Sequence, residues 1–216
     1  MNTTTLDLPR SVPYLVWFDT EYTSLDLQNA QLLQVAALIT DQHLRRVLPW
    51  EADIRLAIHL PGRSSLSTWV QDNLPDLVTL CCSAGAVELK EADLRLASYI
   101  DAAVGMPTES GDKRPVLAGN SIHADWWLAV KYLPRFVERL HYRHFDVTTL
   151  KLEWQMQKPA EGFAKENSDN IRRYFPDAQL PADGSRHDAY YDIQASIAEL
   201  AFYRKHLFQP HRDHLP

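Results

Sequence analysis

The chain has 216 residues, 45% of them hydrophobic, and no internal repeat or low-complexity tract, so we expect one domain over residues 1–216 with a core from about residue 12 to 208. Its formal net charge of −6, from 22 basic against 28 acidic residues, argues against a broad basic surface for long nucleic acid. Long nucleic acid is therefore not expected as the main partner.

The cysteines and the N-terminus indicate the compartment. Cys81 and Cys82 are adjacent and unsuited to an ordinary disulfide, and no Cys-x-x-Cys spacing suggests zinc. The N-terminal MNTTTLDLPR has no apolar signal core, and no stretch approaches the ~20 apolar residues of a membrane span. We expect a cytoplasmic protein without a membrane partner.

The first part of the chain predicts strands. Residues 12–18 are an apolar run that ends at Asp19, and residues 31–40 are a mostly apolar run suited to a buried strand. A third strand is expected within residues 45–58, broken near Pro49.

The rest of the chain alternates helices with short strands. Leu89, Leu96, Ile100 and Val104 recur at helical spacing, and residues 116–118 predict a strand that leads to Gly119 and then to a helix. The neighbouring Trp126 and Trp127 are expected to be core anchors and interface residues. The apolar spacing from 189 to about 206 predicts a last helix. The order βββαβαβα, with an extra helix or two, places the protein in the α/β class.

Asp19 and Glu21 follow the first predicted strand. Side chains two apart on a strand point to the same face, so these carboxylates would repel each other unless one is protonated or a cation lies between them. A divalent metal ion is the usual resolution at neutral pH. The alternative is that Asp-x-Glu is simply the polar side of an amphipathic strand.

His187 and Asp192 lie at the start of the last helix. Five residues correspond to about 140° around a helix, so His187 must precede the helix if it is to lie beside Asp192. A histidine there suits a general base next to a metal ligand. Asp188 is a rival ligand, although the helix N-cap is the favoured interpretation for it.

Together these segments resemble the oligoribonucleases, a family of DEDDh-type 3′–5′ exonucleases. Asp19 and Glu21 match the first motif, Asp125 in GNSIHAD matches the second, and His187 with Asp192 matches the third. The stretch HYRHFDVTTLK is typical of oligoribonucleases and absent from most other members of the group.

The resemblance implies a ribonuclease H-like fold, a mixed sheet flanked by helices. It implies two Mg²⁺ or Mn²⁺ ions held by Asp19, Glu21, Asp125 and Asp192, with His187 removing a proton from the attacking water. The expected reaction is 3′–5′ cleavage of very short oligonucleotides, with dinucleotides as the expected substrates, to 5′-mononucleotides.

The resemblance also implies substrate contacts. Leu25 and Trp69 would contact the bases, and a tyrosine and an arginine from the second subunit of a homodimer would close on the 5′ end. The residues expected to contact substrate are Thr20, Leu25, Trp69, Ser121, Tyr142, Arg143 and Thr148.

Three features depart from the family pattern. Leu74 stands where the family has a phosphate-contacting histidine, Thr20 where leucine is usual, and Ser24 where glycine is usual. The Asp-Thr-Glu motif looks more like that of proofreading DNA exonucleases.

The link over residues 158–186 is longer than expected. Lys165, Arg172, Arg173, Tyr174 and Phe175 could reach phosphate and stack on a base, which would make the link a lid. The favoured alternative is a solvated connecting helix with Tyr174 and Phe175 packed on the core.

The sequence leaves the substrate open. RNA is slightly favoured by the HYRHFDVTTLK stretch, and DNA dinucleotides are kept close behind by Thr20 and Leu74. A catalytically silent relative that binds short nucleotides is a further alternative, although the complete set of acidic residues and histidine argues against it.

Overall fold

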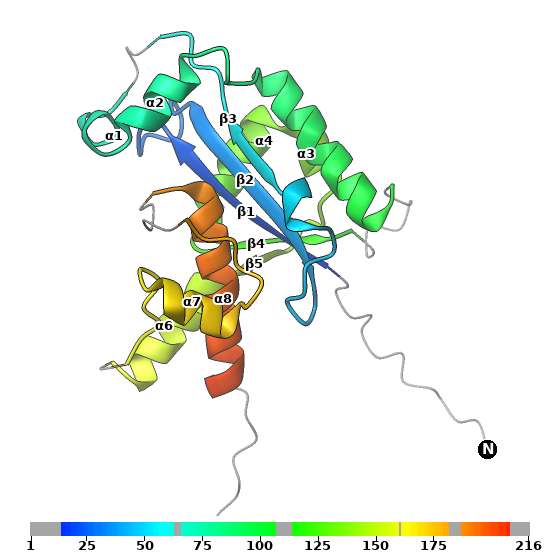
Figure 1. The fold of residues 1–216 in the computed structure, drawn as a ribbon, viewed down its shortest axis with the longest axis vertical. Helices are drawn as coiled ribbons and strands as arrows, with labels where there is room; N and C mark the ends of the chain where they lie inside the picture. The colour runs from blue at the N-terminus through cyan, green and yellow to red at the C-terminus, as the bar shows by residue number, and fades with distance from the viewer. Residues whose placement is uncertain (1–13, 63–65, 107–113, 160, 182–186, 208–216) are drawn as a thin grey trace, which may run out of the picture.

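The computed structural model describes residues 14–62, 66–106, 114–159, 161–181 and 187–207. Its centre is a five-stranded sheet in the order β3-β2-β1-β4-β5 (Figure 1). The strands are β1 (Tyr14–Tyr22), β2 (Leu32–Asp41), β3 (Ile54–Ala57), β4 (Val116–Gly119) and β5 (His144–Asp146). β1 pairs antiparallel with β2 and parallel with β4, so the sheet is mixed.

Helices cover both faces of this sheet (Figure 1). They are α1 (Thr68–Asn73), α2 (Pro75–Cys81), α3 (Leu89–Val104), α4 (His123–Tyr132), α5 (Pro134–Val137), α6 (Val147–Gln157), α7 (Ser168–Tyr174) and α8 (Ala189–Leu207). The predicted order of strands and helices is confirmed, with α3, α4 and α8 as its three helices. The described residues form five further helices, α1, α2, α5, α6 and α7, where one or two were expected.

Strand β1 is apolar on both sides because both of its faces are covered. Trp17 packs in the cluster formed with α6, α7 and α8, whereas Phe18 packs in the cluster formed with α3, α4 and α5. Both side chains are fully buried, and the Trp17 indole donates to Thr40 Oγ1 at 2.9 Å. β1 therefore separates two apolar layers, and its polar end emerges between them.

The end of β4 approaches β1 closely. A Cβ atom at Gly119 would lie 2.9 Å from the carbonyl oxygen of Phe18, so a larger residue would push the two strands apart. This contact is next to Asp19 and Asn120, and glycine therefore lets the two strand ends meet where the acidic residues begin.

Two predictions need correction or qualification. Within residues 45–58 only Ile54–Ala57 forms a strand, and a 3-10 turn over Trp50–Ala52 follows Pro49. Trp127 is 57% exposed and is not a core anchor, because α4 turns Leu128 and Ala129 inward instead. Trp126 is half-buried and packs on the core, as expected. Residues 12, 13 and 208 lie outside the described residues.

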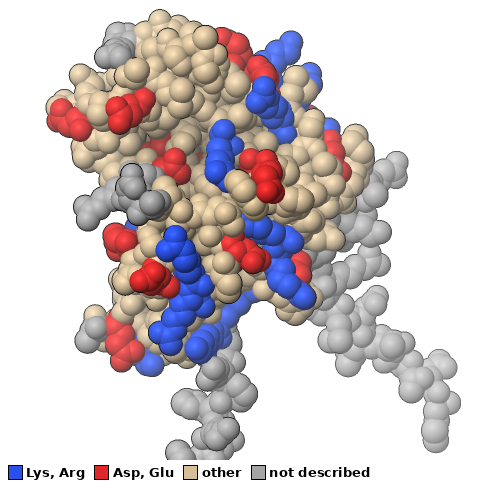
Figure 2. Space-filling model, viewed as in Figure 1, with Lys and Arg blue, Asp and Glu red and all other residues tan. Residues whose placement is uncertain are grey.

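In the described part of the chain, no helix combines the length and apolarity needed to cross a membrane. On the face seen in Figure 2, acidic and basic side chains are interspersed over the described surface.

Candidate active site

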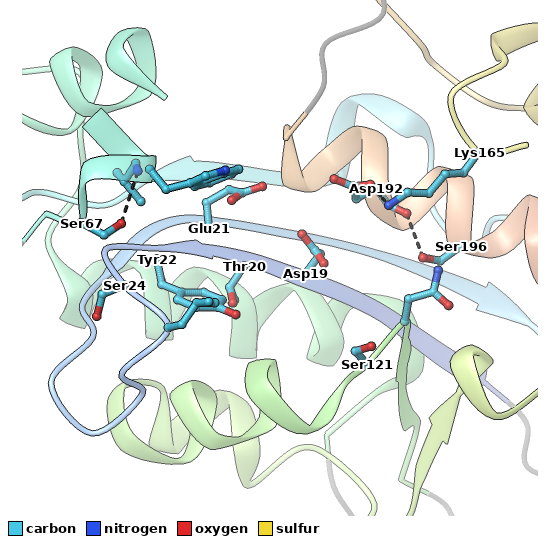
Figure 3. A pocket seen from close by; sticks show the side chains of 14 residues that line it. Asp19, Thr20, Glu21, Tyr22, Ser24, Ser67, Ser121, Lys165, Asp192 and Ser196 are labelled. Carbon is cyan, nitrogen blue, oxygen red and sulfur yellow. Dashed lines mark hydrogen bonds and ion pairs between the residues drawn. The ribbon is translucent and has the colours of Figure 1, made fainter. Parts of the chain in front are cut away.

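Three of the four predicted metal ligands meet at the end of β1. Asp19 and Glu21 lie on the face of β1 that α8 covers, because side chains two apart share a face. Asp192 enters from the first turn of α8, and one oxygen from each of the three carboxylates lies within 4.8 Å of the others (Figure 3).

The fourth predicted ligand, Asp125, is held from the other side of β1. The hydroxyl of Thr20 donates to Asp125 Oδ1 at 2.7 Å, and Asp125 is buried in the first turn of α4. It is not part of the group within 4.8 Å, although its charge contributes to raising the pKa of Asp19. The oligoribonucleases that the sequence resembles usually have leucine at position 20, and a leucine side chain could not donate this hydrogen bond.

The carboxylates of this site disfavour one another's charge. Burial, followed by the charges of Asp125 and Asp192, raises the pKa of Asp19 well above its ordinary value. Burial and the nearby Asp192 raise the pKa of Glu21 to about 8, and burial raises that of Asp125 to about 7 against the hydrogen bond from Thr20. A cation placed among these groups would remove the conflict.

The donor set fits a hard divalent cation. All of the converging ligand atoms are carboxylate oxygens, which suit Mg²⁺, Mn²⁺ or Ca²⁺ better than softer metals.

The start of α8 is fixed by two side chains. Asp188 Oδ1 accepts from the backbone N–H of Tyr191 at 2.9 Å, which is the predicted N-cap contact. Gln34 on β2 donates through Nε2 to Asp188 Oδ2 at 3.0 Å and accepts through Oε1 from the Ala189 N–H at 2.9 Å. The side chain of Gln34, which the sequence did not single out, therefore ties the first turn of α8 to the sheet.

His187 precedes α8, as the spacing required. Its backbone has φ 59°, an uncommon value for a residue with a side chain. The side chain is exposed, and its ring meets the ring of Trp69 edge-on, with centroids 4.9 Å apart.

A cavity of about 610 Å³ opens over the carboxylates. Of the predicted substrate contacts, Thr20, Leu25, Trp69 and Ser121 line it. Leu25 and Trp69 are 89% and 48% exposed, so both apolar surfaces are free to contact a ligand.

The other predicted contacts lie outside the residues that line this cavity. Thr148 lies behind Ser121, accepting from its backbone N–H at 2.8 Å. Tyr142 is 73% exposed and stacks on His141, and the guanidinium of Arg143 lies over the Tyr142 ring at 5.2 Å from its centroid.

Leu74 is buried in the apolar cluster beneath α1 and α2. Its side chain offers no polar group at the position where the resembled family has a phosphate-contacting histidine.

Different residues in the described part of the long link agree with different alternatives, the lid or the connecting helix. Phe175 is buried and Tyr174 packs on the core, which confirms the connecting-helix interpretation for these two residues. Arg172 and Arg173 are exposed on α7. Lys165, by contrast, reaches the cavity, where its Nζ lies 3.3 Å from Asp192 Oδ1. Residues 160 and 182–186 lie outside the described residues.

No protein-family model matches the chain. It is 31% identical over 204 residues to the mitochondrial oligoribonuclease of Bos taurus, covering 92% of this chain and 75% of that protein. It is 32% identical over 201 residues to the oligoribonuclease of Francisella tularensis subsp. novicida, covering 92% of this chain and 98% of that protein. The chain belongs to the oligoribonuclease family.

Solved structures support the fold of this oligoribonuclease family member. Cell-death related nuclease 4 superimposes with a TM-score of 0.58 at 13% identity, and exonuclease I from Methylocaldum szegediense with 0.58 at 18%. The chain spans 64% and 41% of those two chains, which in turn cover 89% and 90% of it. The predicted ribonuclease H-like fold is confirmed, and membership of the family confirms the predicted enzyme class, a 3′–5′ exonuclease.

Proposed function

We propose that this enzyme cleaves dinucleotides and similarly short oligonucleotides to 5′-mononucleotides, with two divalent cations, Mg²⁺ or Mn²⁺, in the acidic site. The observation that carries the proposal is the convergence of Asp19, Glu21 and Asp192 within 4.8 Å below a cavity of about 610 Å³. A cavity of this size takes a small ligand, not a long strand.

Asp19, Glu21, Asp125 and Asp192 would hold the cations. When bound, the cations would supply a water that loses its proton readily and charge stabilisation for the leaving 3′ oxygen. The hydrogen bond from Thr20 to Oδ1 would help to orient the Asp125 carboxylate for this role. His187 would take the proton of the attacking water, because an imidazole nitrogen can accept a proton and its loop precedes the Asp192 turn.

Binding would rest on two exposed apolar side chains. Trp69 and Leu25 would contact the bases, since stacking on an aromatic ring accepts every base. Ser121 would donate to the substrate backbone, held in place by Thr148.

We further propose that the protein is a homodimer located in the cytoplasm. Each chain would fold as a single domain. Tyr142 and Arg143 are exposed and lie outside the cavity lining of their own chain, which supports a role on the substrate of a second subunit.

The preferred substrate has two candidates, RNA and DNA. RNA is favoured by family membership. DNA dinucleotides are the second candidate because of two of the three positions that depart from the family. The Thr20 hydroxyl donates to Asp125, and Leu74 is buried.

The test is cleavage of 5′-labelled RNA dimers, DNA dimers and seven-residue oligomers, with Mg²⁺ or Mn²⁺ and with EDTA. We expect labelled mononucleotide from dimers, loss of cleavage in EDTA, and loss of cleavage in Asp19→Ala. Asp76→Ala, at an exposed position on α2, is the matched control and should keep full activity. Metal-independent cleavage would contradict the metal assignment. No cleavage of any substrate would contradict the whole proposal and favour a nucleotide-binding protein.

A further inference from the structure

Lys165 is the one cationic side chain among the described residues that line the cavity. The other charged groups of the lining are Asp19, Glu21 and Asp192. A phosphodiester is an anion, so it enters a cavity whose fixed charges, apart from Lys165, are of its own sign. This arrangement makes the position of the ammonium group decisive for binding.

The backbone of Lys165 is anchored at its own carbonyl and at residues upstream. The hydroxyl of Tyr191, the neighbour of Asp192 on α8, donates to the Lys165 carbonyl at 2.9 Å. Upstream, the Trp154 indole donates to the Glu161 carbonyl at 2.8 Å, and Phe163 packs against Phe202 with ring centroids 5.8 Å apart. These contacts therefore hold Lys165 in a defined position beside the site.

The side chain of Lys165 is held less firmly than its backbone. It is 45% exposed, and its single ionic contact in the site is the 3.3 Å approach of Nζ to Asp192 Oδ1 (Figure 3). A lysine is a compact charge on a flexible four-carbon stem, so it can exchange one oxygen partner for another nearby.

We propose that Lys165 is a substrate-positioning residue that neutralises Asp192 in the metal-free enzyme and turns to the substrate phosphate when cations occupy the carboxylates. This inference rests on the proposed function. Two divalent cations balance the four carboxylates, so the ammonium group is the positive charge left to match the phosphodiester. Attack by hydroxide adds a further negative charge to the phosphate in the transition state, which strengthens the same contact.

Two opposite effects follow from this exchange. Because the ammonium group and the cations compete for Asp192, removal of Lys165 should tighten metal binding. Because the same group then binds the phosphate, its removal should weaken nucleotide binding. A lysine that only stabilises the fold would weaken both.

The test compares Lys165→Met and Lys165→Arg with the wild type by calorimetry. Mn²⁺ is titrated into the protein without nucleotide, and a 5′-mononucleotide is then titrated into the Mn²⁺-saturated protein. For Lys165→Met we expect Mn²⁺ affinity to rise about 3- to 10-fold, by the Coulomb interaction that is lost. Mononucleotide affinity should fall about 10-fold or more, as for a lost hydrogen bond to a charged group.

Two controls sharpen this comparison. Lys165→Arg keeps the charge, so its affinities for Mn²⁺ and for the mononucleotide should lie close to those of the wild type. Lys90→Met changes an exposed lysine on α3, on the other side of the sheet, and should change neither affinity. In dimer cleavage, Lys165→Met should raise KM more than it lowers kcat.

Three results would overturn the inference. A parallel fall of both affinities would make Lys165 a structural residue, and unchanged affinities would leave it without a role in the site. If the wild type itself neither binds Mn²⁺ nor cleaves dimers, the proposed function fails first and the inference about Lys165 falls with it.

Discussion

Replacing Glu21 with glutamine should abolish metal-dependent cleavage and yet stabilise the metal-free protein. Glu21 is held in a site where burial and Asp192 raise its pKa to about 8. The folded state therefore disfavours the charged form of Glu21. Glutamine keeps the shape of the side chain and removes the charge.

The size of the effect follows from the difference between the folded pKa of about 8 and the ordinary glutamate value of 4.5. That difference corresponds to roughly 4 kcal/mol of unfolding free energy at pH 8. Counter-ions and water that enter the open cavity recover part of it, so we expect a gain of about 1 to 3 kcal/mol. For a chain of this length the melting temperature should rise by about 3 to 10 °C.

The gain should depend on pH. Between about pH 4.5 and 8 the folded protein holds a proton on Glu21 that the unfolded chain has released, so the unfolding free energy of the metal-free wild type falls as pH rises through this window. In Glu21→Gln this part of the fall is absent, and the difference between the two proteins should widen from pH 5 to pH 8.

Thermal unfolding in EDTA at several pH values is the assay, followed by addition of Mn²⁺. Mn²⁺ should stabilise the wild type and have a much smaller effect on Glu21→Gln. Glu51→Gln, at an exposed position, is the control for loss of one negative charge. A variant that melts at or below the wild type at pH 8 in EDTA, or whose gain is the same at every pH, would refute the reasoning.

Three further variants test other parts of the site. His187→Ala should lower kcat by about 100-fold or more if the imidazole is the base, and a small change across the pH–rate profile would remove it from that role. Trp69→Ala should raise KM for dinucleotides by about 5- to 100-fold through lost stacking; an unchanged KM would place the bases elsewhere. Gln34→Leu removes both hydrogen bonds to the start of α8 and should weaken Mn²⁺ binding, measured by calorimetry. A lower melting temperature with unchanged Mn²⁺ affinity would reduce Gln34 to a role in stability.

Local spacing predicted much of the site. The alternation of a strand placed Asp19 and Glu21 on one face, and the turn of a helix put His187 ahead of Asp192. Both rules act over a few residues, so they can be applied without knowing the tertiary structure.

The contacts that the sequence did not predict join distant segments. Thr20 donates to Asp125 across 105 residues, and Gln34 reaches Asp188 across 154. The approach of Lys165 to Asp192 depends on how the link packs, which is decided by buried side chains such as Phe175. Trp126 and Trp127 were expected together to be core anchors and interface residues. Their hydrophobicity could not tell which of them packs on the core, because it says nothing about which side of α4 faces the sheet.

The position of Asp192 on α8, the last of the described elements, has a consequence for synthesis of the protein. A nascent chain that ends before Ala189 lacks one carboxylate of the site and the helix that covers one face of the sheet. Asp19 and Glu21 leave the ribosome early, but they have no Asp192 to complete a cation site until α8 has been made. Nuclease activity should therefore begin only when residues 189–207 have been translated and have docked.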